Sequence, residues 1–149
     1  MANYHLQFSV LYPYGDLTPK QIDDVIAAAI APENQDADHC DVLSGITCEH
    51  QEDTEGIWFY SEDGGDTDGL IDVISTLQKA NKAAKPFTLT WAWTCDKMRV
   101  DAFDGGAVCI NPDGAQFWVN ARTAAEADAA AARERGKKKG AKSRQAQKK

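Results

Sequence analysis

Cys95 is the residue in this sequence best placed to do covalent chemistry. It lies two residues before Lys97 and four before Arg99, and nearby cations lower the pKa of a thiol and so generate the thiolate nucleophile. One predicted function is therefore a small enzyme with a Cys95-centred site. Such a site also needs a base and an orienting group within hydrogen-bond reach, and no histidine is near Cys95 in sequence. We favour the alternative, in which Cys95 closes a core strand and Lys97 and Arg99 are solvated or paired with acidic neighbours.

Other donor-bearing residues match no known site. His39, Cys40, Cys48 and His50 lie among aspartates, but their spacing fits neither a zinc site nor a calcium loop, and none of the four cysteines forms a CxxC pair. The double glycine at 105–106 precedes an expected strand and not a helix, so it predicts a tight loop or bulge and no phosphate-binding loop. We expect no metal and no cofactor.

Charge is distributed very unevenly along the chain. The net charge is −7 over 149 residues. Residues 133–149 hold nine Lys or Arg against one Glu, about +8, whereas the rest holds seven against twenty-two acidic residues, about −15. No Lys or Arg occurs between Lys20 and Lys79, an interval with fifteen Asp or Glu. The negative electrostatic potential of such a segment repels nucleic acid and attracts partners with basic surfaces.

These charges suggest a non-enzymatic acidic binding protein whose partner is a protein with a basic surface. The candidate binding residues are the acidic side chains of the loops in that interval: Asp36, Asp38, Asp41, Glu52, Asp53, Glu55, Glu62, Asp63, Asp66 and Asp68. The basic tail has three alternatives: non-specific contact with nucleic-acid phosphates, folding back over the acidic face, or a solubilising extension. Its phosphate-contacting candidates are Lys137, Lys138, Lys139, Lys142 and Arg144.

The first half of the chain reads as a strand, a helix and a strand pair. Apolar residues alternate over residues 4–12, which predicts a half-buried strand. Thr18 as N-cap, Pro19 and Gln21 predict a helix start, with an apolar stripe over 22–30 and a stop at Pro32. Residues 42–48 and 57–60 predict two strands. The second of them, apolar on both faces, is expected to be covered on both sides.

The second half reads as a helix followed by strands. Asp66 or Thr67 can cap a helix that buries an apolar stripe over residues 70–77. Alternation over 87–95 predicts a long strand, with Trp91 and Trp93 on its core face rather than forming a stacking platform for a base or sugar. A polar loop over 96–106, a short strand over 107–110 and the turn at 111–114 complete the pattern, so 116–119 are expected to pair back as a hairpin.

The element order predicts an α+β fold. A β-α-β-β-α-β order suggests a ferredoxin-like sandwich with both helices on one face of an antiparallel sheet, here with a small C-terminal β extension. We expect one domain over residues 1–120, an Ala-rich, partly helical segment over 121–135 and a disordered basic tail over 136–149.

Three segments carry a resemblance to a known family. They are WFYSEDGG, TLTWAWTCDKMRVDAFDGGAVCI and FWVNA, and they resemble small uncharacterised proteins of bacteriophages and other mobile elements. That family shows L-W-aromatic-x-E followed by S-x-T-W-A-x-T-C-x-K-P-R and a glycine run before Ala. The match covers about residues 55–120, with Met98 at the usual proline and Asp104 at the first glycine of three. The resemblance implies a genomic setting and no specific chemistry.

Location follows from what the sequence lacks. No apolar run approaches the roughly 20 residues of a membrane helix, and MANYHLQF has neither the basic start nor the apolar core of a signal peptide. We therefore expect a protein of the bacterial host cytoplasm. Combined with the resemblance, its acidic surface suggests interference with a nucleic-acid-binding or defence protein of the host.

Overall fold

The computed structural model describes residues 3–31, 33, 42–98 and 103–147. Its elements, in chain order, are β1 (Tyr4–Pro13), α1 (Pro19–Ile30), β2 (Thr47–Gln51), the 3-10 turn η2 (Glu52–Thr54), β3 (Gly56–Ser61), α2 (Thr67–Ala80), β4 (Phe87–Cys95), β5 (Asp104–Ile110), β6 (Gln116–Asn120) and α3 (Ala121–Gln147).

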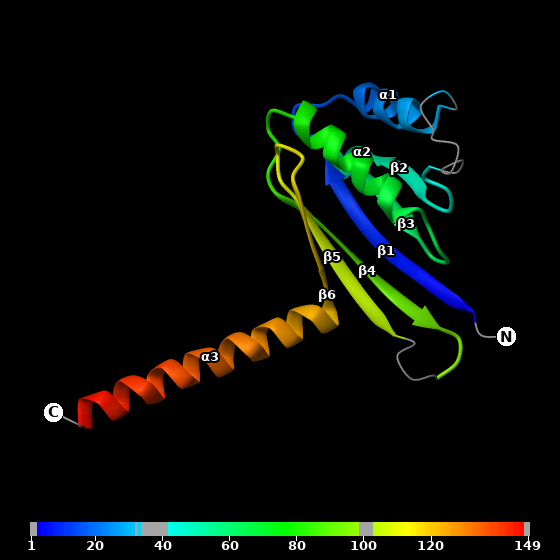
Figure 1. Cartoon of the computed structure of the whole chain (residues 1–149). Coiled ribbons are helices and arrows are strands. Elements are labelled where there is room, and N and C mark those ends of the chain that lie inside the picture. The colour runs from blue at the N-terminus through cyan, green and yellow to red at the C-terminus, as the bar shows by residue number, and fades with distance from the viewer. Residues whose placement is uncertain (1–2, 32, 34–41, 99–102, 148–149) are drawn as a thin grey trace.

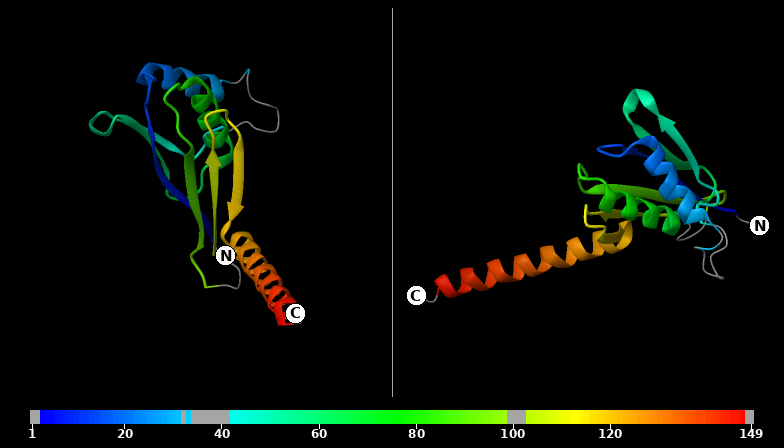
Figure 2. Two further views of the ribbon diagram at one scale, coloured as in Figure 1. Left: turned by 90° about the vertical axis from the view of Figure 1, so that its left-hand side faces the viewer. Right: turned by 90° about the horizontal axis from the view of Figure 1, so that it is seen from above.

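The strands form one antiparallel sheet of six, in the order β2-β3-β1-β4-β5-β6. Helices α1 and α2 lie together against this sheet, and α3 projects away from it (Figures 1 and 2). The α+β class predicted from the sequence is confirmed.

The register defines two faces of the sheet. Leu6 lies opposite Trp93, Phe8 opposite Ser61, and Leu89 opposite Val108; directly opposed residues point to the same side. We call this side the covered face, because many of its side chains, including Leu6, Phe8 and Leu89, form one core cluster with the apolar stripes of α1 and α2. The other side, which includes Trp58, Tyr60 and Leu11, is the open face; none of these three belongs to that cluster.

Both covering helices begin as the sequence predicts. Gln21 N–H donates to Thr18 Oγ1 (3.2 Å), and Thr18 N–H donates to Gln21 Oε1 (2.8 Å), which completes a capping box. Asp66 caps α2 by accepting from Gly69 N–H at 3.0 Å. Each helix then buries its stripe, with Ile22 from α1 and Leu70 from α2 fully inaccessible.

A buried polar clamp joins α2 to the sheet. Gln78 Nε2 donates to the carbonyls of Lys85 and Ile110, both at 2.8 Å, and Gln78 Oε1 accepts from the Tyr12 hydroxyl at 2.9 Å. Asn81 at the helix end donates to the Tyr14 carbonyl at 3.1 Å. All the hydrogen-bonding atoms of the Gln78 amide are therefore used, which is what burial of an amide requires.

Two segments differ from the expected strands. β2 begins only at Thr47, because residues 42–45 form a turn in which Leu43 has φ +62° and its N–H donates to Asp66 Oδ2 at 3.2 Å. β5 begins earlier than expected, so Gly105 and Gly106 are strand residues and not a loop. The Trp91 indole lies where a Cβ of residue 106 would be, so a glycine is needed there for close packing.

The basic tail is helical as far as it is described, to Gln147, which corrects the expected disorder from residue 136. α3 runs without interruption through Gly136 and Gly140 to Gln147, about 40 Å at 1.5 Å per residue. The Asn120 side chain accepts from Thr123 N–H at 2.7 Å and caps the helix start. Alanine, lysine, arginine, glutamate and glutamine are strong helix formers, which accounts for a helix that buries no side chain. Within the described part of the chain, no helix combines the length and apolarity needed to cross a membrane.

Candidate functional site

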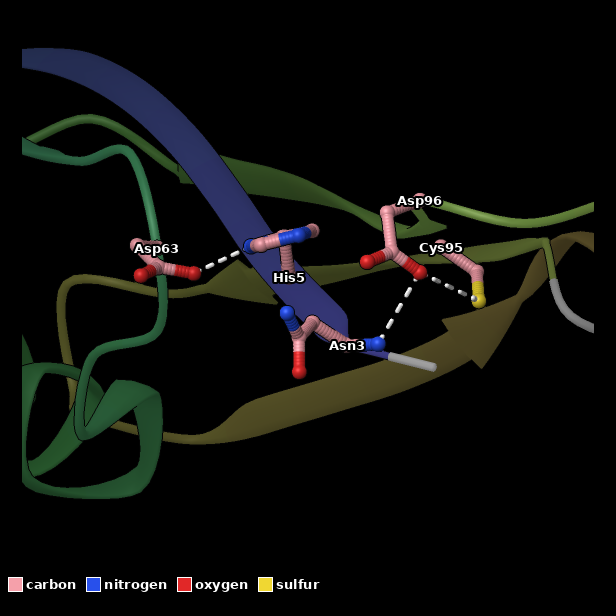
Figure 3. A network of polar contacts seen from close by, with 5 residues as sticks. All are labelled: Asn3, His5, Asp63, Cys95 and Asp96. Carbon is pink, nitrogen blue, oxygen red and sulfur yellow. Dashed lines mark hydrogen bonds and ion pairs between the residues drawn. The ribbon is translucent and has the colours of Figure 1, made fainter. Parts of the chain in front are cut away.

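The Cys95 site expected for an enzyme is not assembled among the described residues. Cys95 is buried at the end of β4, and its thiol contacts Asp96 Oδ1 at 3.9 Å, an oxygen that also accepts from Asn3 N–H at 3.0 Å (Figure 3). His5 lies opposite Thr94, so it is on the open face, where it pairs with Asp63. Among the described residues, Cys95 thus has a carboxylate and no imidazole beside it.

Only one of the two cations expected beside Cys95 lies in the described part of the chain. The Lys97 side chain is exposed, and Arg99 lies outside the described residues. A carboxylate that accepts a hydrogen bond from the thiol does not replace the base and orienting group that a nucleophilic cysteine needs.

The predicted acidic residues do not form one cluster. Asp36, Asp38 and Asp41 lie outside the described residues. Glu52, Asp53 and Glu55 are exposed at the tip of the β2–β3 hairpin, and Glu62, Asp63 and Asp68 are exposed beyond the other end of β3. Because β3 has six residues at about 3.3 Å each, roughly 20 Å separates the two groups.

Asp66 has a structural role that sets it apart from the other acids. One carboxylate oxygen accepts from Gly69 N–H at the start of α2, and the other accepts from Leu43 N–H at 3.2 Å. Both oxygens are therefore occupied within the chain. Asp66 fixes the turn before β2 against the N-terminus of α2, so we remove it from the candidate binding residues.

An aromatic pair lies on the open face between the two acidic groups. The rings of Trp58 and Tyr60, alternate residues of β3, stack with centroids 4.0 Å apart and planes 28° from parallel. Trp58 Nε1 donates to Ser9 Oγ at 2.8 Å, and the Tyr60 hydroxyl donates to Glu49 Oε1 at 3.0 Å. Leu11 lies opposite Trp58 and is exposed. These hydrogen bonds hold both rings in place on a surface that no described helix covers.

Negative charge surrounds this pair. The hydrogen bond to Glu49 is the main reason that the pKa of Tyr60 is raised; desolvation and the charges of Glu49 and Glu62 raise it further, while a hydrogen bond with Thr47 lowers it. Glu62 is therefore close enough to act on the phenol. Aromatic faces and carboxylates together are the groups that bind a guanidinium or an ammonium.

A second polar group joins α1 to the β2–β3 hairpin. His50 Nε2 lies 2.7 Å from Asp23 Oδ1, and His50 Nδ1 lies 2.8 Å from the Tyr14 hydroxyl. Burial, then the charges of Glu52 and Asp23, raise the pKa of Tyr14. Burial and Asp23 raise that of Cys48. A raised pKa disfavours the anionic nucleophile, so neither the phenol nor the thiol is activated. The hydrogen bonds of His50 to Asp23 and Tyr14 therefore fit a structural role, in which they hold α1 against the hairpin.

No metal cluster is assembled among the residues that the structure describes: no group of three or more potential ligands is close enough to hold an ion. His39 and Cys40, two of the donors noted in the sequence, lie outside that part of the chain. His50 has both ring nitrogens engaged by Asp23 and Tyr14.

The basic tail residues are on the exposed second half of α3. Lys138 and Lys142 are four residues apart and share one side of the helix with Arg135, and Lys137 pairs with Glu134 at 3.1 Å. All five candidates, Lys137, Lys138, Lys139, Lys142 and Arg144, are exposed. The helix leads them away from the sheet (Figure 1), so the structure does not fold the tail back over the acidic residues of its own chain.

Sequence reasoning missed the aromatic pair because it expected β3 to be covered on both sides. The alternation of Trp58 and Tyr60 was visible in the sequence. The signal that could have identified an open face is the hydroxyl of Tyr60 and the indole N–H of Trp58, since both need polar partners when buried. The hydrogen-bonded group of Asp23, Tyr14 and His50 joins three distant segments and has no sequence signal.

Comparisons with known proteins assign this chain to no family. The chain matches no family model, and neither curated proteins nor solved structures show significant similarity to it.

Proposed function

We propose that this protein is a non-enzymatic binding protein that takes a basic protein partner on its acidic surface. The observation that supports this proposal best is the stack of Trp58 and Tyr60 on the open face, flanked by Glu49 and Glu62. An arginine or lysine side chain of the partner would lie on the accessible part of these half-buried rings and pair with a carboxylate. Cation–π contacts contribute about 0.5–2 kcal/mol, so several such contacts are needed for a stable complex.

The partner class we propose is a nucleic-acid-binding or defence protein of a bacterial host. Such proteins present cationic surfaces that normally contact phosphates, and an interval of the chain that carries fifteen Asp or Glu and no Lys or Arg offers them a competing anion. The bacteriophage or mobile-element origin and the cytoplasmic location rest on the sequence resemblance and composition. Non-specific contact of the α3 lysines with nucleic acid stays a prediction, supported by their exposure.

Titration with a fluorescent arginine-rich peptide tests the binding face. Trp58→Ala removes the stacking surface and should weaken binding about tenfold, which corresponds to 1.4 kcal/mol. Glu49→Gln should weaken it severalfold. Binding should also fall as ionic strength rises from about 0.01 to about 1 M, where the Debye length shrinks from about 30 to about 3 Å.

The matched control is Glu126→Gln, the same charge change on exposed α3. If Glu126→Gln and Glu49→Gln weaken binding equally, only net charge matters and the proposed face is wrong. For the enzyme alternative, the discriminating measurement is the rate of Cys95 alkylation. Labelling faster than that of an ordinary exposed thiol at neutral pH would count in favour of that alternative.

We also propose that the first four strands and two helices form a ferredoxin-like unit. Its support is the order β2-β3-β1-β4 with antiparallel neighbours, and two helices on the same face. β5 and β6 would then be the C-terminal extension, added beyond β4.

A further inference from the structure

β6 is an edge strand whose outer backbone has no neighbouring strand among the described residues. Asn111 N–H donates to the Ala115 carbonyl at 2.9 Å. Hydrogen-bonded and non-bonded pairs alternate in an antiparallel ladder, so Phe117 and Val119 direct their backbone groups to β5. Gln116, Trp118 and Asn120 direct theirs outward. This edge therefore offers a set of donors and acceptors to an incoming strand.

The side chains of β6 are unusually apolar for an edge. Phe117, Trp118 and Val119 are 60%, 50% and 44% exposed. Phe117 and Val119 lie on the open face; Trp118 lies on the covered face and meets the Trp91 ring edge to face, with centroids 5.8 Å apart. None of the five residues of β6 carries a charge. Long or apolar edges without charge are pairing sites, and natural sheets usually protect them.

The other edge of the same sheet is protected in that way. β2 also has five residues, and its central residue is Glu49. If two copies of β2 paired antiparallel about a twofold axis at the strand centre, each Glu49 would face the Glu49 of the other copy, and like charges directly opposite destabilise a strand pair. The equivalent pairing of two β6 strands brings together only neutral side chains.

We propose that β6 pairs antiparallel with β6 of a second copy of this chain, about a twofold axis at Trp118, and joins the two six-stranded sheets. Phe117 of each copy then lies opposite Val119 of the other. The occupant is a second copy because the strand is uncharged along its length and therefore self-compatible in this symmetric arrangement.

The charge distribution of the chain is compatible with this dimer. Five strand spacings of about 4.8 Å place the acidic β2 edge roughly 24 Å from β6, more than twice the Debye length of about 10 Å at 0.1 M salt. α3 projects from the end of β6 on the side away from β5 (Figure 1). α3 begins at Ala121, after the last of the five β6 residues that would pair with the second copy.

Sedimentation equilibrium of the full chain tests the proposal. The wild-type chain should form dimers. Phe117→Lys, an exposed change that leaves the hydrogen bonds to β5 in place, should raise the dimer dissociation constant by about tenfold or more, because the charge must be desolvated beside an apolar strand. Adding Val119→Glu should restore the dimer, since each new lysine then faces a new glutamate. Phe117→Lys with Val119→Lys should dissociate it furthest.

Two controls keep the test specific. Glu49→Lys changes the charge of the opposite edge and should leave the dimer unaffected. Thermal unfolding of each variant reports whether the chain still folds. A wild-type chain that stays monomeric at every concentration overturns the proposal. A dimer that folded Phe117→Lys leaves unchanged also overturns it, as does failure of the charge pair to restore association.

Discussion

Leu89 and Trp93 lie on the same strand and the same face of the sheet, yet one is fully buried and the other is 44% exposed. The covered face therefore has two regions. Near Leu89, α2 closes over β1, β4 and β5, and the buried side chains form the core. Near Trp93, the strands continue past the helices (Figure 1), and Tyr4, which lies opposite Cys95, is exposed as well. The difference teaches that strand alternation determines which face a residue lies on, whereas the reach of the helices determines whether that face is buried.

The largest predicted effect is a difference in the free energy of unfolding between a variant of the closed region and a variant of the exposed region. Leu89→Ala leaves a cavity in the closed region and should lower the free energy of unfolding by about 2–5 kcal/mol. Trp93→Ala removes more atoms but leaves mostly solvent, so its loss should be clearly smaller. Urea unfolding of both variants measures the contrast. Equal losses would show that the exposed region is as tightly packed as the core.

The next effect concerns the polar clamp that closes the core region. Gln78→Met keeps the size of the side chain but removes its hydrogen bonds, leaving the buried Ile110 carbonyl and the Tyr12 hydroxyl short of partners. We expect a loss of about 1–3 kcal/mol in unfolding free energy. Gln116→Met, which loses the hydrogen bonds of Gln116 to Ser75 and Trp118 in a less buried place, is the control in urea unfolding. A loss no larger than that of the control would refute a special role for Gln78.

The smallest effect appears at alkaline pH. Burial raises the pKa of Tyr12, only partly offset by its hydrogen bond with Asn81. The unfolded chain therefore releases this proton first, near pH 10. The stability that Tyr12 contributes is fully present below that pH and declines as pH rises further.

Tyr12→Phe should therefore lose stability less steeply above about pH 10 than the wild-type chain. Thermal unfolding across that range measures the slopes, and the other tyrosines contribute equally to both chains. Parallel slopes would mean that the Tyr12 phenol is as free to ionise in the folded chain as in the unfolded one.

Local signals predicted the elements well. The capping box of Thr18 and Gln21 places the start of α1 without tertiary information, because all its partners lie within four residues. The alternation in β4 gives its face, and Asn111 with Gly114 gives the hairpin turn. Each of these signals depends on neighbours in the chain, which is why the sequence contains it.

Other features depended on distant partners. Leu43 takes a positive φ while bonded to Asp66 across 23 residues, which shortens β2. Gly106 is a strand residue that leaves room for Trp91. The candidate acids divide into two groups because β3 lies between them, and His50 meets Asp23 and Tyr14 only when α1 packs beside the hairpin.

The sequence by itself determined the α+β class, the faces of the long strands and the separation of acidic and basic charge, since these follow from periodicity and composition. Only the tertiary structure decided which aromatic residues are buried, which acidic residues are free to bind, and which sheet edge is uncharged. Those outcomes depend on contacts between elements far apart in the chain, and no local pattern specifies how far a packed helix extends over a sheet.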